Sequence, residues 1–128
     1  MMNPLTRLLL VEDEPTVLAA LQKFFNAAGL EVHCARELEE AEALITTNDY
    51  DVVIADLRLS WECSVEGLEV LRFVRRNSRR THVIILSAHA GADIRRSADA
   101  LGADAFIAKP ALLPQIAETV NRVLGRAV

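Results

Sequence analysis

Polar side chains stand directly after four of the five short apolar runs in this sequence. Acidic residues follow the first and third runs, a serine follows the fourth and a lysine follows the fifth, whereas only Ala35 and Arg36 follow the second. If the runs are parallel strands, their carboxyl ends meet at one edge of the sheet, which is where open α/β sheets bind ligands. We therefore expect a cluster at that edge, with the second run as an outer strand. The polar residues are, in chain order, Glu12, Asp13, Glu14, Asp56, Ser87 and Lys109.

The residue types in this cluster indicate phosphoryl chemistry. Glu12, Asp13 and Asp56 bring three carboxylates together, and each like-charged pair costs about 4 kcal/mol at ~4 Å and an effective dielectric of about 20. Carboxylate oxygens favour a hard divalent cation such as Mg²⁺, and Lys109 supplies a second positive charge. Ser87 adds a hydroxyl donor. A carboxylate beside Mg²⁺, a lysine and a hydroxyl is a nucleophile for a phosphoryl group, and the same groups would hold the resulting acyl phosphate.

Length and composition fit a single globular domain. The chain has 128 residues, of which 52% are hydrophobic and 25% charged, and its 14 basic and 18 acidic side chains give a net charge of −4. These values exclude intrinsic disorder and argue against nucleic-acid binding as the main role of the domain. Two cysteines are too few for a disulfide scaffold and indicate a reducing compartment. Since no apolar run approaches the about 18 residues of a membrane span and no signal peptide is evident, we expect one cytoplasmic domain over residues 1–128, with its core from about 7 to 124.

The apolar runs alternate with amphipathic stretches. The runs are rich in Val, Ile and Leu without polar alternation, which is typical of parallel strands covered on both faces. Pro15 and Pro114 suit the first turns of helices, and Gly29 and Gly102 suit the left-handed residues that follow helices. The pattern predicts five strand–helix units, and so a doubly wound parallel α/β sheet. The predicted strands are Leu8–Val11, Leu30–Cys34, Val52–Ala55, Val83–Leu86 and Ala105–Ala108.

Five segments resemble the response-regulator receiver domain, the phospho-acceptor module of two-component signalling, as in chemotaxis regulators. They occur in the family's order and at nearly its spacing, from Arg7 to about Leu124. The resemblance implies a flavodoxin-like sheet with the strand order 2-1-3-4-5. The segments are Leu9–Pro15 (LLVEDEP), Val53–Leu57 (VIADL), Gly67–Leu71 (GLEVL), Ile85–Ala88 (ILSA) and Ala105–Pro110 (AFIAKP).

The resemblance implies the identity of the acceptor and of the metal ligands. Asp56 would take a phosphoryl group from the phosphohistidine of a sensor kinase or a phosphotransfer protein. Asp13 would bind Mg²⁺ directly and Glu12 through a water molecule, and Asp56 and the backbone carbonyl of Arg58 would complete the metal site. Lys109 would pair with a phosphoryl oxygen, and the peptide bond after it is expected to be cis. The domain would catalyse only its own phosphorylation and slow dephosphorylation.

The resemblance also implies a switch at Ser87 and Phe106. On phosphorylation the Ser87 hydroxyl would move to the phosphoryl group and the Phe106 ring would turn inward behind it. This would change the face formed by the fourth helix, the fifth strand and the fifth helix. A downstream protein, a fused output domain or a second copy would read that face, and we expect no membrane contact and no direct nucleic-acid contact. From its residue type alone, Phe106 is equally well a fixed core aromatic.

One segment departs from the family pattern. No proline follows Asp56 closely and the next glycine is Gly67, so the segment Leu59–Val65 reads as an insertion of about three residues relative to the receiver domains it resembles. This loop borders the acceptor and would shield the acyl phosphate, slow its hydrolysis or alter kinase docking. Trp61 either lies over the site or packs on the surface, and His89, two positions after Ser87, would modulate access of water.

Other functions fit the residues less well. An aspartate-nucleophile phosphohydrolase normally has a second acid two positions after the nucleophile, where this chain has Arg58. A dinucleotide-binding module would have a Gly-x-Gly-x-x-Gly turn after the first strand, where Glu12 and Asp13 stand. A degenerate receiver acting as a constitutive interaction domain would not need the full cluster. The basic cluster, which we interpret as a solvated helix face and loop, consists of Arg72, Arg75, Arg76, Arg79 and Arg80.

Overall fold

Five strands alternate with five helices along the chain, as predicted. The structure is a computed structural model that describes residues 6–56, 65–88 and 92–125. None of its described helices is long and apolar enough to cross a membrane. The elements are β1 (Arg7–Val11), α1 (Pro15–Ala27), β2 (Glu31–Ala35), α2 (Leu38–Thr47), β3 (Val52–Asp56), α3 (Val65–Asn77), β4 (His82–Ser87), α4 (Ala92–Ala100), β5 (Ala105–Ala108) and α5 (Leu113–Val123).

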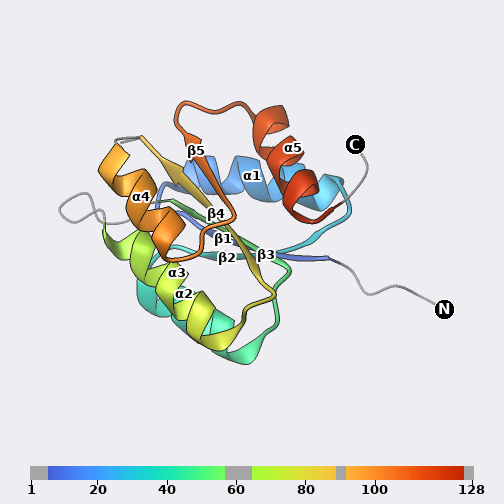
Figure 1. The fold of residues 1–128 in the computed structure, drawn as a ribbon. Coiled ribbons are helices and arrows are strands. Elements are labelled where there is room, and N and C mark those ends of the chain that lie inside the picture. The colour runs from blue at the N-terminus through green and yellow to red at the C-terminus, as the bar shows by residue number, and fades with distance from the viewer. Residues whose placement is uncertain (1–5, 57–64, 89–91, 126–128) are drawn as a thin grey trace.

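The five strands form one parallel sheet in the order β2-β1-β3-β4-β5 (Figure 1). The predicted doubly wound α/β fold of flavodoxin-like strand order is therefore confirmed. β2, the strand whose end carries no candidate residue, lies at an edge of the sheet, as expected. The other four strands are consecutive neighbours, so the chemistry-bearing residues that follow them are delivered side by side.

Both faces of the sheet are covered, because successive strand residues point to opposite sides. One core contains Leu9, Val53 and Ile85 together with buried side chains of α2, α3 and α4. The other contains Leu10 and Ile54 together with buried side chains of α1 and α5. Figure 1 accordingly shows α1 and α5 on one side of the sheet and α2 and α3 on the other. Burial on both sides explains why the strands read as uninterrupted apolar runs.

The helix ends follow the predicted punctuation. Pro15 opens α1, and the side chain of Glu14 caps that helix by accepting a hydrogen bond from the backbone N–H of Val17 at 2.9 Å. Gly29 and Gly102 have φ angles of 94° and 96°, which is the left-handed conformation expected after α1 and α4.

Strand boundaries differ from the prediction by one residue in places. β3 and β4 extend to Asp56 and Ser87, so these two candidate residues are themselves the last residues of their strands. β2 begins at Glu31 rather than at Leu30, because the N–H of Leu30 still donates to the carbonyl of Phe25 at the end of α1, at 3.1 Å.

The interpretation of the basic cluster as wholly solvated is wrong for one arginine. Arg75 of α3 has a side chain only 22% exposed; it donates to the carbonyls of Thr81 and Gly102 and forms an ion pair with Asp104. Sequence alone could not show this, because the carbonyls come from the α3–β4 and α4–β5 connections, whose positions relative to α3 depend on the tertiary fold. The arginines of this cluster that are exposed, as expected, are Arg72, Arg76, Arg79 and Arg80.

Candidate functional site

The strand register brings the candidate residues to one edge of the sheet. Asp56 ends β3, and Ser87 ends β4 opposite Ala108 of β5. Glu12 and Lys109 come directly after β1 and β5. The four strands are neighbours and run in one direction, so all four side chains start from the carboxyl edge of the sheet, as the sequence predicts.

Lys109 lies between two buried carboxylates. Its Nζ forms an ion pair with Oδ2 of Asp56 and stands 3.6 Å from Oε1 of Glu12. Asp56 and Glu12 are only 1% and 2% exposed, and the Lys109 side chain is 19% exposed. The peptide bond between Lys109 and Pro110 is cis, as the resemblance implies. One ammonium group therefore serves two carboxylates that have almost no access to water.

Glu12 is a buried carboxyl group whose pKa is raised. Burial, followed by the hydrogen bond and the negative charge of Asp56, raises the pKa of Glu12 from its ordinary 4.5 to about 7, against the opposing effects of a backbone hydrogen bond and of Lys109. Its Oε2 accepts that bond from the N–H of Glu14 at 3.1 Å. Its Oε1 is buried, and among the described residues no donor makes a hydrogen bond to it. An all-oxygen set with such an orphaned atom fits a hard divalent cation.

Asp13, the other expected side-chain ligand, lines a different hollow. Asp13 is half-buried and lines a hollow with Arg36, Glu37 and Glu40. Within the described part of the chain, no three acidic, histidine or cysteine side chains are already gathered as a metal-binding group. The backbone carbonyl of Arg58 falls outside the described residues. So do Trp61, His89 and the predicted insertion Leu59–Val65, apart from Val65, which begins α3.

Ser87 and Phe106 lie on the same face of the sheet. Ile85 and Phe106 are paired across β4 and β5 and both belong to the core under α3 and α4. Ser87 is two residues beyond Ile85 in the same strand and therefore points to that same side. It is 1% exposed, and its carbonyl accepts a hydrogen bond from the N–H of Lys109 at 2.7 Å. A movement of the Ser87 side chain would therefore take place on the face of the sheet that holds Phe106.

A groove of about 580 Å³ opens beside the cluster on the other face of the sheet. Lys109 and Leu86 line its inner end, and α1 and the start of α5 form its walls. Two large apolar side chains are well exposed in the described structure, Val17 at 37% in the groove wall and Leu112 at 75% next to it. The sequence analysis missed this groove, because it arises from how α1 packs against α5. Its further lining residues are Thr16, Ala20, Leu21, Ala88, Pro110, Ala111, Leu113 and Ile116.

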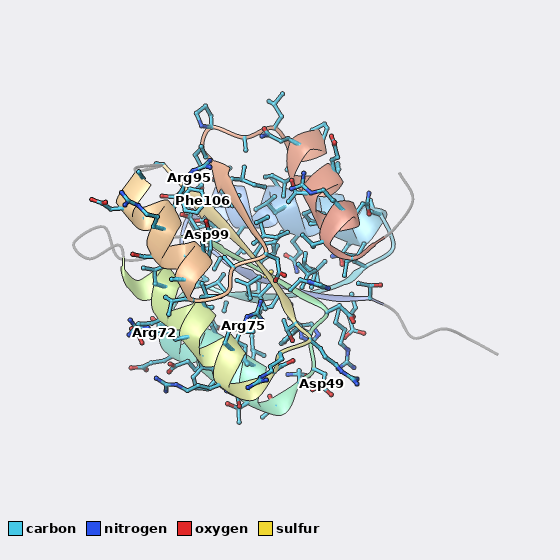
Figure 2. All side chains as sticks on the ribbon, viewed as in Figure 1. Asp49, Arg72, Arg75, Arg95, Asp99 and Phe106 are labelled. Carbon is cyan, nitrogen blue, oxygen red and sulfur yellow. The ribbon has the colours of Figure 1, made fainter. Side chains whose placement is uncertain are left out.

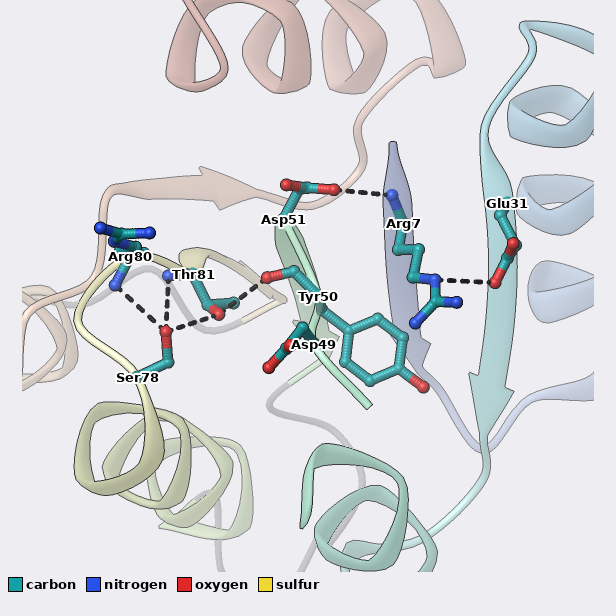
Figure 3. Close-up of a pocket in the computed structure, with 8 residues that line it drawn as sticks. All are labelled: Arg7, Glu31, Asp49, Tyr50, Asp51, Ser78, Arg80 and Thr81. Atoms are coloured by element: carbon teal, nitrogen blue, oxygen red, sulfur yellow. Dashed lines mark hydrogen bonds and ion pairs between the residues drawn. The ribbon is translucent and has the colours of Figure 1, made fainter. Parts of the chain in front are cut away.

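A second polar pocket, of about 600 Å³, lies at the opposite edge of the sheet (Figure 3). Arg7 forms an ion pair with Glu31 there through Nε at 3.0 Å, and its backbone N–H donates to Asp51 at 2.8 Å. The hydroxyl of Thr81 donates to the carbonyl of Tyr50 at 2.8 Å. The pocket lies at the amino ends of the strands, so it takes no part in the cluster around Asp56.

Comparison with known proteins identifies the family and agrees with the fold. The family described as the response regulator receiver domain matches residues 8–121. The transcriptional regulatory protein PmrA of Pectobacterium parmentieri is 34% identical over 120 residues, which are 94% of this chain and 53% of that protein. The curated relatives are longer than this chain, which spans 26% of the regulatory protein AtoC of Escherichia coli, a relative 32% identical over 96% of this chain.

Solved structures share the same fold. The receiver domain of HemR from Leptospira biflexa, solved without phosphorylation, has a TM-score of 0.85 and 30% identity, and the match covers 96% of this chain and 97% of that domain. Because the family match extends over most of the chain and includes the segments that carry the clustered side chains, the protein belongs to the response regulator receiver domain family.

Proposed function

We propose that residues 1–128 form a single receiver domain that takes a phosphoryl group on Asp56 and acts as a switch in a two-component pathway. The observation that carries this proposal is the buried Asp56 at the carboxyl edge of the sheet, held by Lys109 and next to Glu12. The family is a signalling family rather than one of classical enzymes. We infer that the only reactions of the domain are its own phosphorylation and dephosphorylation, and that it works in the cytoplasm.

In the proposed transfer, a carboxylate oxygen of Asp56 attacks the phosphorus of a phosphohistidine on a sensor kinase or phosphotransfer protein. The phosphorus–oxygen bond forms, the phosphorus–nitrogen bond breaks, and the imidazole nitrogen leaves with the electron pair and takes up a proton. Lys109 is already bound to Asp56, so its ammonium group stays beside the carboxyl and can pair with a phosphoryl oxygen. Water later hydrolyses the acyl phosphate and restores the carboxylate.

We further propose that Glu12 and Asp13 bind Mg²⁺, together with Asp56 and the backbone carbonyl of Arg58. When bound, this ion would offset the charge of the carboxylates and of the phosphoryl oxygens. The buried Oε1 of Glu12, which accepts no hydrogen bond within the described residues, supports a cation-binding role for this carboxyl group. The half-buried Asp13 follows Glu12 directly in the chain.

The proposed output is a change in the face formed by α4, β5 and α5. The hydroxyl of Ser87 would bond to a phosphoryl oxygen on Asp56, and the space it leaves would admit the ring of Phe106, which lies on the same side of the sheet. A downstream protein, an output domain or a second copy of the chain would read the altered face. No direct contact with nucleic acid or membrane is part of the proposal.

We propose that the phosphate-donating protein binds in the groove beside Lys109. The groove reaches the cluster through Lys109, and its wall carries the exposed Val17, with the exposed Leu112 adjoining. A partner seated there holds its phosphohistidine at the open edge of the sheet, close to Asp56. An apolar surface of this kind, continuous with the reacting group, suits an amphipathic helix of the donor.

Intact mass spectrometry after incubation with Mg²⁺ and acetyl phosphate tests the proposal. One added phosphoryl group is expected, and it should be absent from Asp56→Asn and from samples without Mg²⁺. If no adduct forms, binding of the Mg²⁺–fluoroberyllate analogue is measured next, because small donors sometimes fail where a kinase succeeds. Failure of both would contradict the proposal and favour a receiver-shaped interaction domain, whereas continuous release of phosphate from many turnovers would favour a phosphohydrolase.

A further inference from the structure

The ring of Phe106 lies against a cation. The guanidinium carbon of Arg95 stands 5.0 Å from the centroid of the Phe106 ring. Arg95 belongs to α4 and Phe106 to β5, and Figure 2 labels both where α4 passes over the start of that strand. The distance is within the range in which a guanidinium over an aromatic face is attracted by the ring's negative charge density. The two residues therefore form a cation–π pair between α4 and β5.

The Phe106 ring has the core on one side and Arg95 on the other. On its inner side Phe106 packs against the core under α3 and α4, together with Ile94 and Leu101 of the α4 region. On its outer side Arg95 covers it, and both residues also line a groove of about 400 Å³ between α4 and α5. Arg95 is exposed, and its guanidinium contacts the Phe106 ring.

We propose that Arg95 is a positioning residue that holds Phe106 in its resting place and thereby sets how readily modification of Asp56 switches the domain. If the ring moves toward Ser87, it gives up the contact with Arg95. A contact made only in the resting state stabilises that state by some factor. The affinity of a ligand that binds the switched state better is then lowered by the same factor. This inference rests on the proposed function, because it needs Phe106 to move.

The test measures the affinity of the protein for Mg²⁺–fluoroberyllate by titration. Arg95→Gln should bind the analogue about two- to fivefold more tightly than the wild type, which corresponds to the about 0.5–1 kcal/mol usual for an exposed cation–π contact. Arg95→Lys, which keeps a cation, should restore most of the wild-type affinity. The matched control is Arg96→Gln, which removes the same charge from the neighbouring exposed position of α4, where the side chain pairs with Asp93 at 3.1 Å. It should leave the affinity unchanged.

A double-mutant cycle separates positioning from general charge effects. In a Phe106→Leu background, Arg95→Gln should no longer change the affinity, because no ring remains for the cation to hold. An equal effect of Arg95→Gln with and without the ring overturns the proposal, and so does an equal effect of Arg95→Gln and Arg96→Gln. NMR gives an independent reading without the analogue: the side-chain protons of Arg95 should be shifted upfield by the ring and should lose that shift in Phe106→Leu.

The outcomes also separate this inference from the proposed function. If the wild type binds the analogue but Arg95→Gln behaves like the wild type, the positioning role fails and the proposed function stands. If the wild type does not bind the analogue, the proposed function fails and the positioning role falls with it, even where NMR shows the ring contact.

Discussion

Arg75 in α3 donates two hydrogen bonds to the carbonyl of Gly102, from Nε at 3.1 Å and from Nη2 at 2.7 Å. The same guanidinium reaches the carbonyl of Thr81 at 2.5 Å and Oδ2 of Asp104 at 2.8 Å. Arg75 (labelled in Figure 2) therefore ties α3 to the turn between α4 and β5. These bonds anchor the C-terminal end of the helix whose Arg95 covers the Phe106 ring.

Gly102→Ala should destabilise the domain more than Gly29→Ala does. Both glycines have left-handed φ angles, of 96° and 94°, so both substitutions carry a similar conformational cost of about 1–2 kcal/mol. A Cβ at residue 102 would also lie 2.9 Å from Nε of Arg75, whereas one at residue 29 meets nothing within 4 Å. Urea unfolding should show an excess of about 1 kcal/mol or more for Gly102→Ala. In an Arg75→Ala background that excess should vanish, and its persistence would rule out the crowding by Arg75.

Glu12→Gln should stabilise the metal-free protein above neutral pH while weakening its affinity for Mg²⁺. The folded pKa of Glu12, about 7, lies above the ordinary 4.5, so the folded protein binds more protons than the unfolded chain between these values. The free energy of unfolding of the wild type should therefore fall as the pH rises from 4.5 to 7. Gln removes that dependence and should gain on the order of 2 kcal/mol at about pH 8. Urea unfolding across this pH range, with and without Mg²⁺, checks both effects; a decline in Glu12→Gln as steep as in the wild type would contradict the assignment.

Tyr50 should ionise only in strongly alkaline solution. Burial raises the pKa of its hydroxyl from 10.0 to about 12, and its oxygen lies 2.6 Å from Nδ1 of His33. Since the folded pKa exceeds that of the unfolded chain, the contribution of Tyr50 to stability should be complete below pH 10.0 and be lost as the pH rises toward 12. The chain has one tyrosine, so the near-ultraviolet absorbance of tyrosinate reports this residue alone. Titration in urea should give the ordinary value, and an ordinary value in the folded protein would show that the hydroxyl is accessible.

Val17→Asp and Leu112→Asp should slow phosphoryl transfer from a protein donor at least tenfold while leaving phosphorylation by acetyl phosphate unchanged. Both positions lie at the starts of helices, in the first turn of α1 and at the N-cap of α5, where Asp is well tolerated. Transfer rates from a phosphorylated histidine kinase, compared with those from acetyl phosphate, check the groove directly. Ala92→Asp, at the exposed first position of α4 and outside the groove, is the matched control. Equal losses with both donors would place the effect in the cluster rather than in binding.

The sequence was sufficient to predict the sheet and the meeting of Glu12, Asp56 and Lys109 at its carboxyl edge, whereas Asp13, expected with them, lines a separate hollow. Each strand is a run of apolar residues covered on both sides, so its position is fixed by composition over four to six residues. The order of the strands in the sheet then decides which strand ends are neighbours. The segments that resemble the receiver family imply that order. Asp56, Lys109 and Glu12 come together because β1, β3 and β5 deliver them to one edge, with β4 between the last two.

The helix packing was not predictable in the same way. The contact of Arg95 with Phe106 depends on the rotation of α4 over β5, and the burial of Arg75 depends on carbonyl groups that lie 6 and 27 residues along the chain. Periodicity shows which side of a helix is apolar, but it does not show which turn of a neighbouring element lies beneath each residue. A charged residue such as Arg75, which lies where a helix packs against a neighbouring element, is therefore easily predicted to be exposed when it is not.

The groove that reaches Lys109 and the ring of Phe106 lie on opposite faces of one sheet. The single layer of the sheet separates the face on which a donor would bind from the face on which the Phe106 ring would turn. Helix α5 lies along both surfaces, because its first turns line the groove and its other residues line the hollow beside Arg95 and Phe106. Under the proposed function, a substitution in α5 can therefore change donor binding and output together, as can one in the row of side chains at the carboxyl edge of the strands. Helices α1 and α4 each belong to one surface, so they can diverge in evolution without redesign of the other.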